Sequence, residues 1–277
     1  MSATIRPSVS LQRWTLADIP WHAIQRERVA RDKELFHMVS AASFVEITTH
    51  LYTRNLIEYF DGDAEVTDWL EQHWLHEELQ HGEALKRYVQ IAWPEFDWER
   101  TYRDYLREYS TCCKLEALEA TRSMEMAARC VVEMGTASYY TALSRLSPEP
   151  VLNVLTRHIR EDEVRHYKYF YGYFRRYRAA EGSGRTRVLQ ALWHRLKMID
   201  GEDAYIALKH VYAVSHPGEP FDSRVYRKLQ KRFRHLVGGH FPHQMSAKML
   251  LKPLELGPRA QHIATPILET LLRRLVA

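Results

Sequence analysis

Long stretches of this 277-residue chain contain almost no glycine or proline, and this feature limits its possible folds more than any other. The 11 Gly and 11 Pro fall mostly near the ends and in short junctions, such as residues 146–150 and 181–184. Between these junctions, apolar residues recur three and four positions apart, whereas the alternation typical of strands is rare. The pattern predicts an all-α protein with helices at residues 34–59, 64–92, 98–108, 113–145, 149–180, 185–213, 222–237 and 259–275.

The longest predicted helices follow one another through short connections. Such helices are typical of an antiparallel bundle, because each must bury its apolar stripe against its neighbours. No low-complexity tract or short repeat interrupts the pattern. We predict an N-terminal segment at residues 1–33, a helical bundle at residues 34–180, and additional helices packed on the bundle at residues 181–277.

Composition and charge argue against several classes of protein. The chain holds 39 Lys and Arg against 35 Asp and Glu, and this excess is too small to indicate nucleic-acid binding. Its three cysteines include the adjacent pair Cys112 and Cys113, so a disulfide framework is not indicated. The first residues lack the apolar core of a signal peptide, and no apolar run reaches the length of a membrane helix. We therefore expect a cytoplasmic protein without a membrane partner.

Two Glu-x-x-His pairs lie on long predicted helices. Glu78 and His81 form the first pair and Glu163 and His166 the second. Residues three apart lie on one face of a helix, so each pair can point at one spot. A single pair of this kind is common on the solvated face of a charged helix, but two pairs in one chain are much rarer. The repetition predicts a site built between the two helices.

The other two long helices each carry one glutamate in an apolar stretch. Glu46 lies in AASFVEITTH and Glu133 in CVVEMGTASYY, where an unpaired charge would be costly. Dinuclear carboxylate sites in helical bundles use one Glu from each of two helices and a Glu-x-x-His from each of the other two. The intervals of 32 residues from Glu46 to Glu78 and 30 from Glu133 to Glu163 suit neighbouring antiparallel helices. The predicted metal ligands are therefore Glu46, Glu78, His81, Glu133, Glu163 and His166.

This set of side chains suits particular metals. Carboxylate oxygens and imidazole nitrogens favour iron or manganese, and four carboxylates carry enough charge for two divalent ions. Among the neighbouring acids, Asp162 is a candidate to hydrogen-bond a ligand histidine. We expect Glu77, Glu83 and Glu161 to be surface charges.

The sequence around these residues resembles the ferritin-like di-iron superfamily, and within it the soluble acyl-carrier-protein desaturases. EELQHG at Glu77–Gly82 is similar to the EExxHG motif of that family, and DEVRH at Asp162–His166 is similar to its DExRH motif. In EMGT, Thr136 follows Glu133 by three positions, as a threonine follows the ligand glutamate in the desaturases. The resemblance covers residues 34–180 and implies a ferritin-like four-helix bundle.

The resemblance also implies a cofactor, a reaction and partners. Two iron ions, with manganese possible at one position, would be held by the predicted ligands, and dioxygen would oxidise an organic substrate at an unactivated C–H bond. Thr136 would be a catalytic residue that hydrogen-bonds dioxygen or metal-bound water, although a role in packing is the alternative. Electrons would come from a ferredoxin-type donor, the substrate would be a fatty acyl thioester of acyl carrier protein, and the protein would be a homodimer. The basic segment Arg227–His235 would hold the acidic carrier, unless it is only the solvated face of a helix.

Several residues near the predicted site are not suited to binding a long acyl chain. Thr49, His50 and Thr53 share a face with Glu46, which indicates a smaller or more polar substrate. His50 is a candidate extra ligand or proton donor, and a buried histidine with satisfied hydrogen bonds is the alternative. The aromatic residues Trp74 and Tyr140 would either narrow a substrate tunnel or belong to the core.

Other functions fit the same residues. A di-iron site of this kind supports hydroxylation or N-oxygenation of a small metabolite, and hydroxylation of modified transfer RNA is supported only by the weak positive charge. Iron oxidation and binding as in ferritins is a second class, although the chain extends well beyond the bundle. A bundle that only binds partners is a third class. Metal content distinguishes the third class, and a pocket for an organic substrate distinguishes the second.

Overall fold

The computed structural model describes residues 13–112, 118–198 and 201–276, and the chain in these ranges is helical without any strand. The all-α prediction is therefore confirmed for the described residues. Three short 3-10 helices, Leu16–Asp18, Trp21–Ala23 and Arg26–Arg28, precede the long helices. The α-helices are α1 (Lys33–Ile47), α2 (Thr49–Tyr59), α3 (Ala64–Trp69), α4 (Leu75–Ala92), α5 (Trp98–Tyr109), α6 (Arg122–Leu146), α7 (Pro150–Glu181), α8 (Arg185–Lys197), α9 (Glu202–Ser215), α10 (Ser223–Gly238), α11 (His243–Leu251) and α12 (Pro258–Val276).

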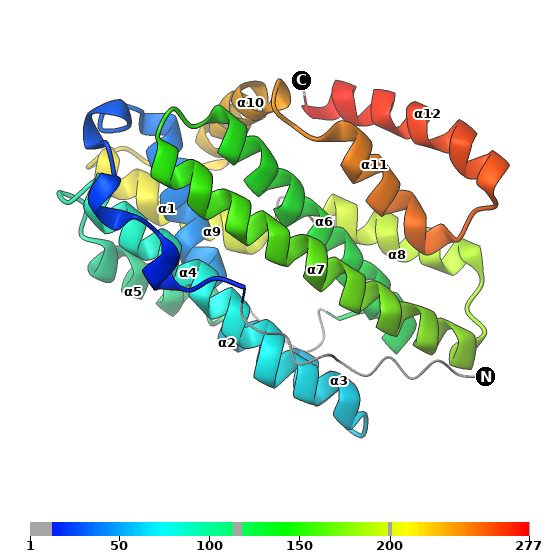
Figure 1. Ribbon diagram of the computed structural model, residues 1–277. Coiled ribbons are helices and arrows are strands. Elements are labelled where there is room, and N and C mark those ends of the chain that lie inside the picture. The colour runs from blue at the N-terminus through cyan, green and yellow to red at the C-terminus, as the bar shows by residue number, and fades with distance from the viewer. Residues whose placement is uncertain (1–12, 113–117, 199–200, 277) are drawn as a thin grey trace.

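The longest helices pack side by side. α6 packs along α7, α1 packs against α4, and α4 contacts α7 (Figure 1). The start of α7 follows from its sequence: Pro150 occupies the first turn, where its missing N–H is not needed, and the Glu149 side chain accepts a hydrogen bond from the Leu152 amide (2.8 Å). Only three residues separate α6 from α7, so the two helices run antiparallel.

Two apolar cores lie along these helices, one toward each end. The first contains Phe44, Leu85 and Ile159, and the second contains Trp74 and Phe170. Helices α6 and α7 contribute apolar side chains to both cores, whereas α1 and α4 contribute to the first and α2, α3 and the turn at Leu70–Trp74 contribute to the second. The predicted ligands lie between them along the chain, so the polar layer is sealed on two sides by close-packed apolar side chains.

Two of the predicted helices are interrupted next to predicted ligands. The helix expected at 34–59 is broken at Thr48, because α1 ends at Ile47 and α2 begins at Thr49. The Thr48 hydroxyl donates to the Phe44 carbonyl (2.6 Å), a local bond that competes with a regular helix. The helix expected at 64–92 contains a π-helical turn at Leu70–Trp74, one turn before Glu78. Such turns are frequent at functional sites.

Other predicted boundaries were wrong in the described residues. The helix expected to begin at residue 113 begins at Arg122, where the Thr121 side chain caps it; residues 113–117 lie outside the described ranges. The helix expected at 185–213 is divided into α8 and α9 near Gly201. Helix α11 was not predicted, because its nine residues are short for a helix and are flanked by the junction GGHFP and by Pro253.

The helices after α7 pack on those before it. α9 contacts α1 and α5, α8 and α11 contact α6, and α12 lies against α11 along one edge of the molecule (Figure 1). None of the helices in the described ranges has both the length and the apolar character needed to cross a membrane.

Candidate metal centre

The six predicted ligand side chains come together in the interior. They come from the end of α1, from α4, from the middle of α6 and from the middle of α7. Each is at most 6% exposed. Six buried residues with carboxylate or imidazole side chains need compensation from each other or from cations. The residues are Glu46, Glu78, His81, Glu133, Glu163 and His166.

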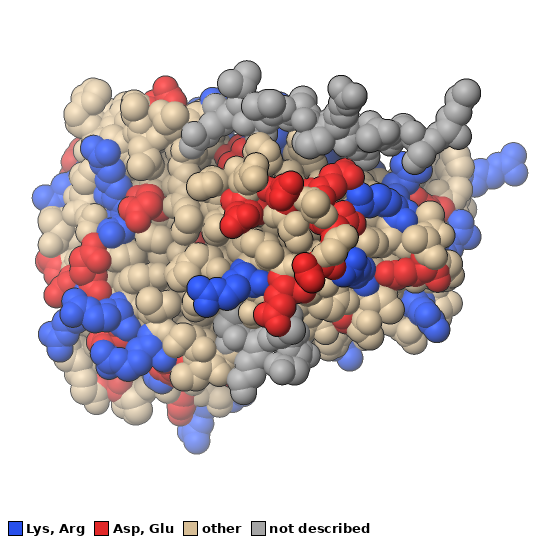
Figure 2. Space-filling view, turned by 90° about the horizontal axis from the view of Figure 1, so that it is seen from below, with Lys and Arg blue, Asp and Glu red and all other residues tan. Residues whose placement is uncertain are grey.

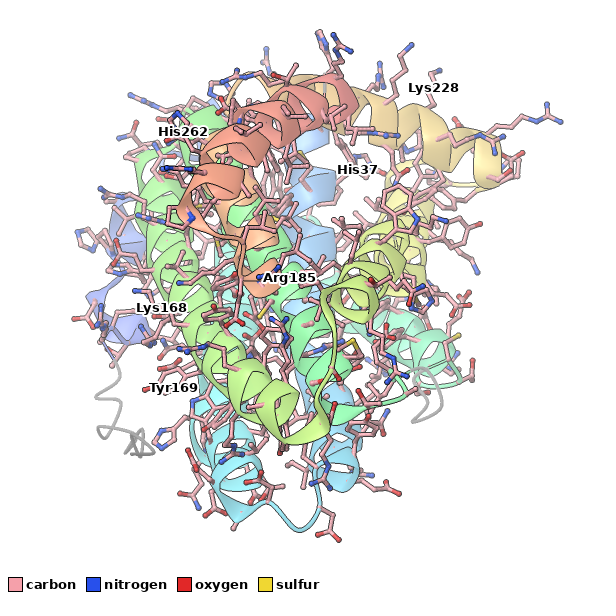
Figure 3. All side chains as sticks on the ribbon, turned by 90° about the vertical axis from the view of Figure 1, so that its right-hand side faces the viewer. His37, Lys168, Tyr169, Arg185, Lys228 and His262 are labelled. Carbon is pink, nitrogen blue, oxygen red and sulfur yellow. The ribbon has the colours of Figure 1, made fainter. Side chains whose placement is uncertain are left out.

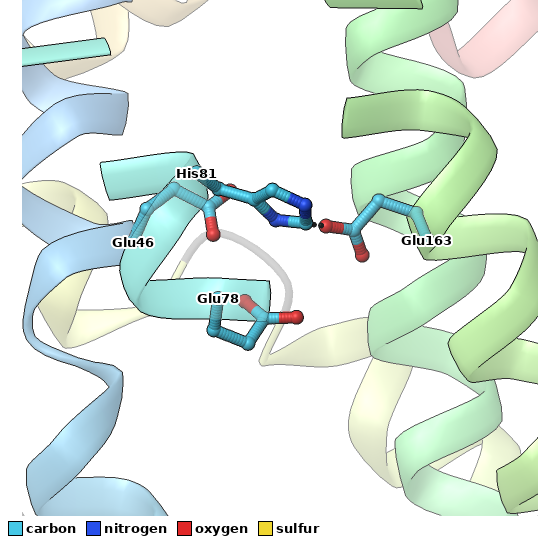
Figure 4. Close-up of side chains that lie close together, drawn as sticks. All are labelled: Glu46, Glu78, His81 and Glu163. Carbon is cyan, nitrogen blue, oxygen red and sulfur yellow. Dashed lines mark ion pairs between the residues drawn. The ribbon is translucent and has the colours of Figure 1, made fainter. Parts of the chain in front are cut away.

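These side chains form two groups that overlap. In each group, one potential ligand atom from every residue lies within 4.8 Å of the others. The first group is Glu46, Glu78, His81 and Glu163, which Figure 4 shows converging from α1, α4 and α7. The second is Glu78, Glu133, Glu163 and His166. Glu78 and Glu163 belong to both groups, so the arrangement could hold two metal ions with two carboxylates common to both.

Several inward-facing atoms have no hydrogen-bond partner among the described residues. They are His81 Nδ1, His166 Nδ1, Glu133 Oε2 and Glu163 Oε1. His81 Nδ1 lies 3.3 Å from Glu163 Oε1, and His166 Nδ1 lies 3.0 Å from Glu78 Oε1. Buried polar atoms without partners are rare in folded proteins. Nitrogen and oxygen atoms left unpaired and facing one another are what a metal cation would satisfy, so the donor set fits the implied metal.

The outer nitrogen of each histidine is held by another carboxylate. His81 Nε2 lies 3.0 Å from Asp162 Oδ2, and His166 Nε2 lies 2.7 Å from Glu77 Oε2. Arg165 contacts both carboxylates, at 2.7 Å from Glu77 and 2.8 Å from Asp162. Carboxylates in this position orient a metal-binding imidazole and increase its basicity. The predicted contact of Asp162 is therefore present, to the predicted ligand His81.

The prediction that Glu77 is a surface charge was wrong. Glu77 is 7% exposed and faces α7, where His166 and Arg165 compensate its charge. Glu83 and Glu161 are exposed, as predicted. The helical period alone does not distinguish the buried glutamate from the exposed one on α4, because the position of α7 decides which of them is covered.

Trp14 is a contact of the site that the sequence did not indicate. Its indole Nε1 donates to Asp162 Oδ2 (2.7 Å), and its ring stacks on His81 at a centroid distance of 6.1 Å. It is 2% exposed and lies in the N-terminal segment, outside the helices that carry the ligands. No spacing in the sequence connects Trp14 with Asp162, which lies 148 residues away.

The charges of the site follow from its burial. Burial, together with the charge of Glu163, raises the pKa of Glu46, and burial raises the pKa of Glu133 to about 8. Burial also acts to raise the pKa of Glu163, but the imidazole of His81, 3.3 Å away, outweighs it and holds that pKa below its ordinary value. Glu46 and Glu133 therefore resist ionisation in the presence of the charged Glu163. A bound cation would remove this repulsion.

Thr136 and Tyr140 on α6 donate to carboxylates of the predicted ligands. Thr136 Oγ1 lies 2.6 Å from Glu163 Oε2, closer than to the carbonyls of Val132 and Glu133 in its own helix. The Tyr140 hydroxyl donates to Glu46 Oε1. Tyr140 is 1% exposed, and the edge of Trp74 packs against His166 with the ring centroids 6.5 Å apart. Both aromatic residues belong to the apolar cores, which agrees with the second of their two predicted roles.

Both interpretations of His50 were wrong. Its side chain is exposed, and Nδ1 lies 3.2 Å from the Ile47 carbonyl. The reason is the interruption at Thr48, because a face continued from Glu46 through an unbroken helix does not extend across it. His50 is therefore neither beside the ligand groups nor buried.

No family model and no curated protein matches this chain. The interpretation of the site therefore depends on its own geometry and on the motifs in the sequence.

Replacing Glu77 by glutamine is expected to weaken metal binding about 10- to 100-fold, because His166 would lose the carboxylate that orients it. The measurement is the dissociation constant for Fe(II) or Mn(II) by anaerobic titration. Glu83→Gln, which makes the same change at an exposed position of α4, is the matched control and should bind as the wild type does. Equal affinities for both variants would show that Glu77 has no part in the site.

Proposed function

We propose that this protein is a ferritin-like four-helix bundle that holds two iron ions and uses dioxygen to oxidise an organic substrate. The bundle would consist of α1 with α2, α3 with α4, α6, and α7. The observation that carries the proposal is the sharing of Glu78 and Glu163 between two ligand groups, each completed by one further glutamate and one histidine. A site for a single structural ion would have no need of two overlapping groups.

The predicted ligands and the apolar cores have separate roles in this proposal. Glu46 and His81 would complete one metal position, and Glu133 and His166 would complete the other. When bound, two ferrous ions supply electrons for the activation of dioxygen. The apolar cores on both sides keep bulk water from the reacting groups.

Thr136 would control a proton at a shared ligand. Its hydroxyl donates to Glu163 Oε2, so a rotation about its Cα–Cβ bond would transfer that donor to another acceptor in the site. Thr136 is only partly buried, in contrast to the ligands. Its hydroxyl could therefore pass a proton between the site and its surroundings. We propose it as the catalytic residue of the site.

The nearest analogy for the substrate is a fatty acyl thioester of acyl carrier protein, with a ferredoxin-type electron donor and a homodimeric enzyme. The alternatives within the same class are hydroxylation and N-oxygenation of a small metabolite. The support for this part comes from the desaturase-like motifs alone. The buried residue Thr53 does not favour a polar substrate, since its hydroxyl is already bonded to the Thr49 carbonyl (2.9 Å).

Anaerobic loading with Fe(II), followed by exposure to dioxygen, tests the proposal. We expect two irons per chain and a transient optical absorption that depends on dioxygen. Glu133→Ala should bind less iron and lose the transient, because the variant removes a ligand from one group only. No stoichiometric metal, or binding that is indifferent to Glu133, would contradict the proposal. Continued iron oxidation without any organic product would instead indicate a ferritin-like activity.

A threonine series tests the duty of Thr136. Thr136→Val keeps the shape but removes the hydroxyl, so we expect the rate of substrate oxidation to fall at least about tenfold with the iron content unchanged. Thr136→Ser should restore most of the rate. Thr141→Val is the control, because the Thr141 hydroxyl on the same helix donates to the Ala137 carbonyl of its own helix (2.7 Å) and to no carboxylate in the part of the chain that the structure describes. Equal rates for the two valine variants would remove Thr136 from the mechanism.

A further inference from the structure

Helix α12 is apolar on two faces. Leu268 and Leu272 pack against the core, as expected for a surface helix. Four further apolar side chains point outward with exposed fractions of 63, 57, 49 and 68%. They lie four residues apart and so form one continuous stripe, called the outer stripe below: Ile263, Ile267, Leu271 and Leu275. When the outer face of a surface helix is also apolar, that face is usually a binding site for another protein or for a membrane.

Cations border the outer stripe, and exposed carboxylates do not. Arg259, Arg273 and Arg274 are exposed on α12. Its one acid, Glu269, is half-buried and paired with Arg273 at 2.7 Å. Whatever covers this face must therefore combine an apolar region with negative charge.

The neighbouring helix α10 extends the positive charge. Its sequence SRVYRKLQKRFRHLVG contains six Lys and Arg and no acid, and α10 contacts α12. Arg232 pairs with Glu34 at 3.5 Å, whereas the other five have no ion pair among the residues that the structure describes. Figure 3 shows Lys228 projecting outward from α10 at the end of the molecule where α12 lies.

Charge is distributed unevenly along the whole chain. Residues 223–277 contain 11 Lys and Arg but only two Asp and Glu, which leaves residues 1–222 with a net charge of −5. The face opposite α12 shows acidic and basic side chains intermingled (Figure 2). A positive end on a chain that is otherwise slightly negative indicates a specific anionic partner.

In contrast to the expectation from the sequence that the protein has no membrane partner, we propose that the face formed by α10 and α12 binds the surface of a bilayer that contains anionic phospholipids. The outer stripe would enter the boundary between headgroups and acyl chains, and the lysines and arginines would remain among the headgroups. A second copy of this chain fits the face less well. Pairing two α12 helices in either direction would place arginines against arginines without an exposed carboxylate between them. An anionic lipid surface complements both the stripe and its cations.

Sedimentation of the full chain with vesicles tests this proposal and does not depend on the metal. We expect binding to vesicles of phosphatidylcholine and phosphatidylglycerol to exceed binding to phosphatidylcholine alone by about tenfold or more, and to weaken as salt is raised. The double variant Ile267→Gln, Leu271→Gln should lower this binding about tenfold. The triple variant Lys228→Gln, Lys231→Gln, Arg234→Gln should also lower vesicle binding about tenfold, and it leaves the Arg232 ion pair intact.

The double variant Leu189→Gln, Val214→Gln is the matched control, because these residues are 54% and 45% exposed on α8 and α9. It should bind vesicles as the wild type does. Equal loss in the control and in the α12 variant would overturn the proposal. The proposal would also be overturned if the protein did not bind vesicles but formed a dimer that Ile267→Gln, Leu271→Gln disrupts in sedimentation analysis. Binding to acyl carrier protein without binding to vesicles would overturn it as well.

Discussion

Glu163→Gln is expected to reduce the metal content from two ions per chain to none. Glu163 contributes to both ligand groups, so its replacement weakens both positions together, whereas Glu46→Gln affects only one group and should leave one ion. Glutamine keeps the volume of the side chain and an oxygen that accepts the Thr136 hydrogen bond, but it removes a negative charge. Metal analysis after anaerobic loading and removal of free ions distinguishes the two variants.

Thermal unfolding gives an independent measurement of the same effect. At a metal concentration about 100-fold above the dissociation constant, binding should stabilise the wild type by about 2.7 kcal/mol, which corresponds to a rise in Tm of about 5–10 °C. Glu163→Gln should lose this rise. Without metal it should unfold somewhat earlier than the wild type, because the buried imidazole of His81 would lose the carboxylate that compensates it.

Glu161→Gln is the control for this variant. It lies two residues away on α7, is exposed, and among the described residues forms an ion pair with Arg160 alone, at 3.4 Å. It should retain two ions. If Glu163→Gln and Glu46→Gln each lost a single ion, Glu163 would not be shared and the two-ion arrangement would have to be abandoned.

Gly82→Ala is expected to destabilise the protein and to disrupt the metal centre. A Cβ atom at Gly82 would lie 2.5 Å from both the Cα and the backbone nitrogen of Ile47, where real Cβ atoms do not approach. Helices α1 and α4 would have to separate, at a cost of about 1–3 kcal/mol or more. Ile47 follows Glu46 and Gly82 follows His81, so the separation would pull two ligands of one group apart.

A fall in Tm of several degrees, together with loss of one metal ion, would agree with this expectation. Gly239→Ala is a suitable control, because a Cβ there meets nothing within 4 Å and the residue already has helical backbone angles. Wild-type stability and metal content in Gly82→Ala would mean that α1 and α4 do not approach this closely.

Features that depend on local periodicity could be predicted from the sequence. The helices of the described ranges were largely recognised, because apolar spacing determines which residues share a face. Within each Glu-x-x-His pair, the spacing alone brings the two side chains to one side, and the structure brings all six predicted ligands together. The breaks were not predicted, since the hydroxyl of Thr48 and the junction near Gly201 interrupt the helices without a change in apolar spacing.

Other features depend on how the helices pack against one another, and this packing could not be predicted from the spacing of apolar residues. Helical period places Glu77 and Glu83 on α4 but does not say that α7 covers only the first. It likewise does not bring Trp14 from the N-terminal segment to Asp162, or Gly82 against Ile47. The sequence by itself determined a helical chain and six residues suited to metal. The tertiary structure decided which carboxylates are shared, which acids hold the histidines and which face of α12 stays uncovered, because these properties arise from contacts between residues far apart in the chain.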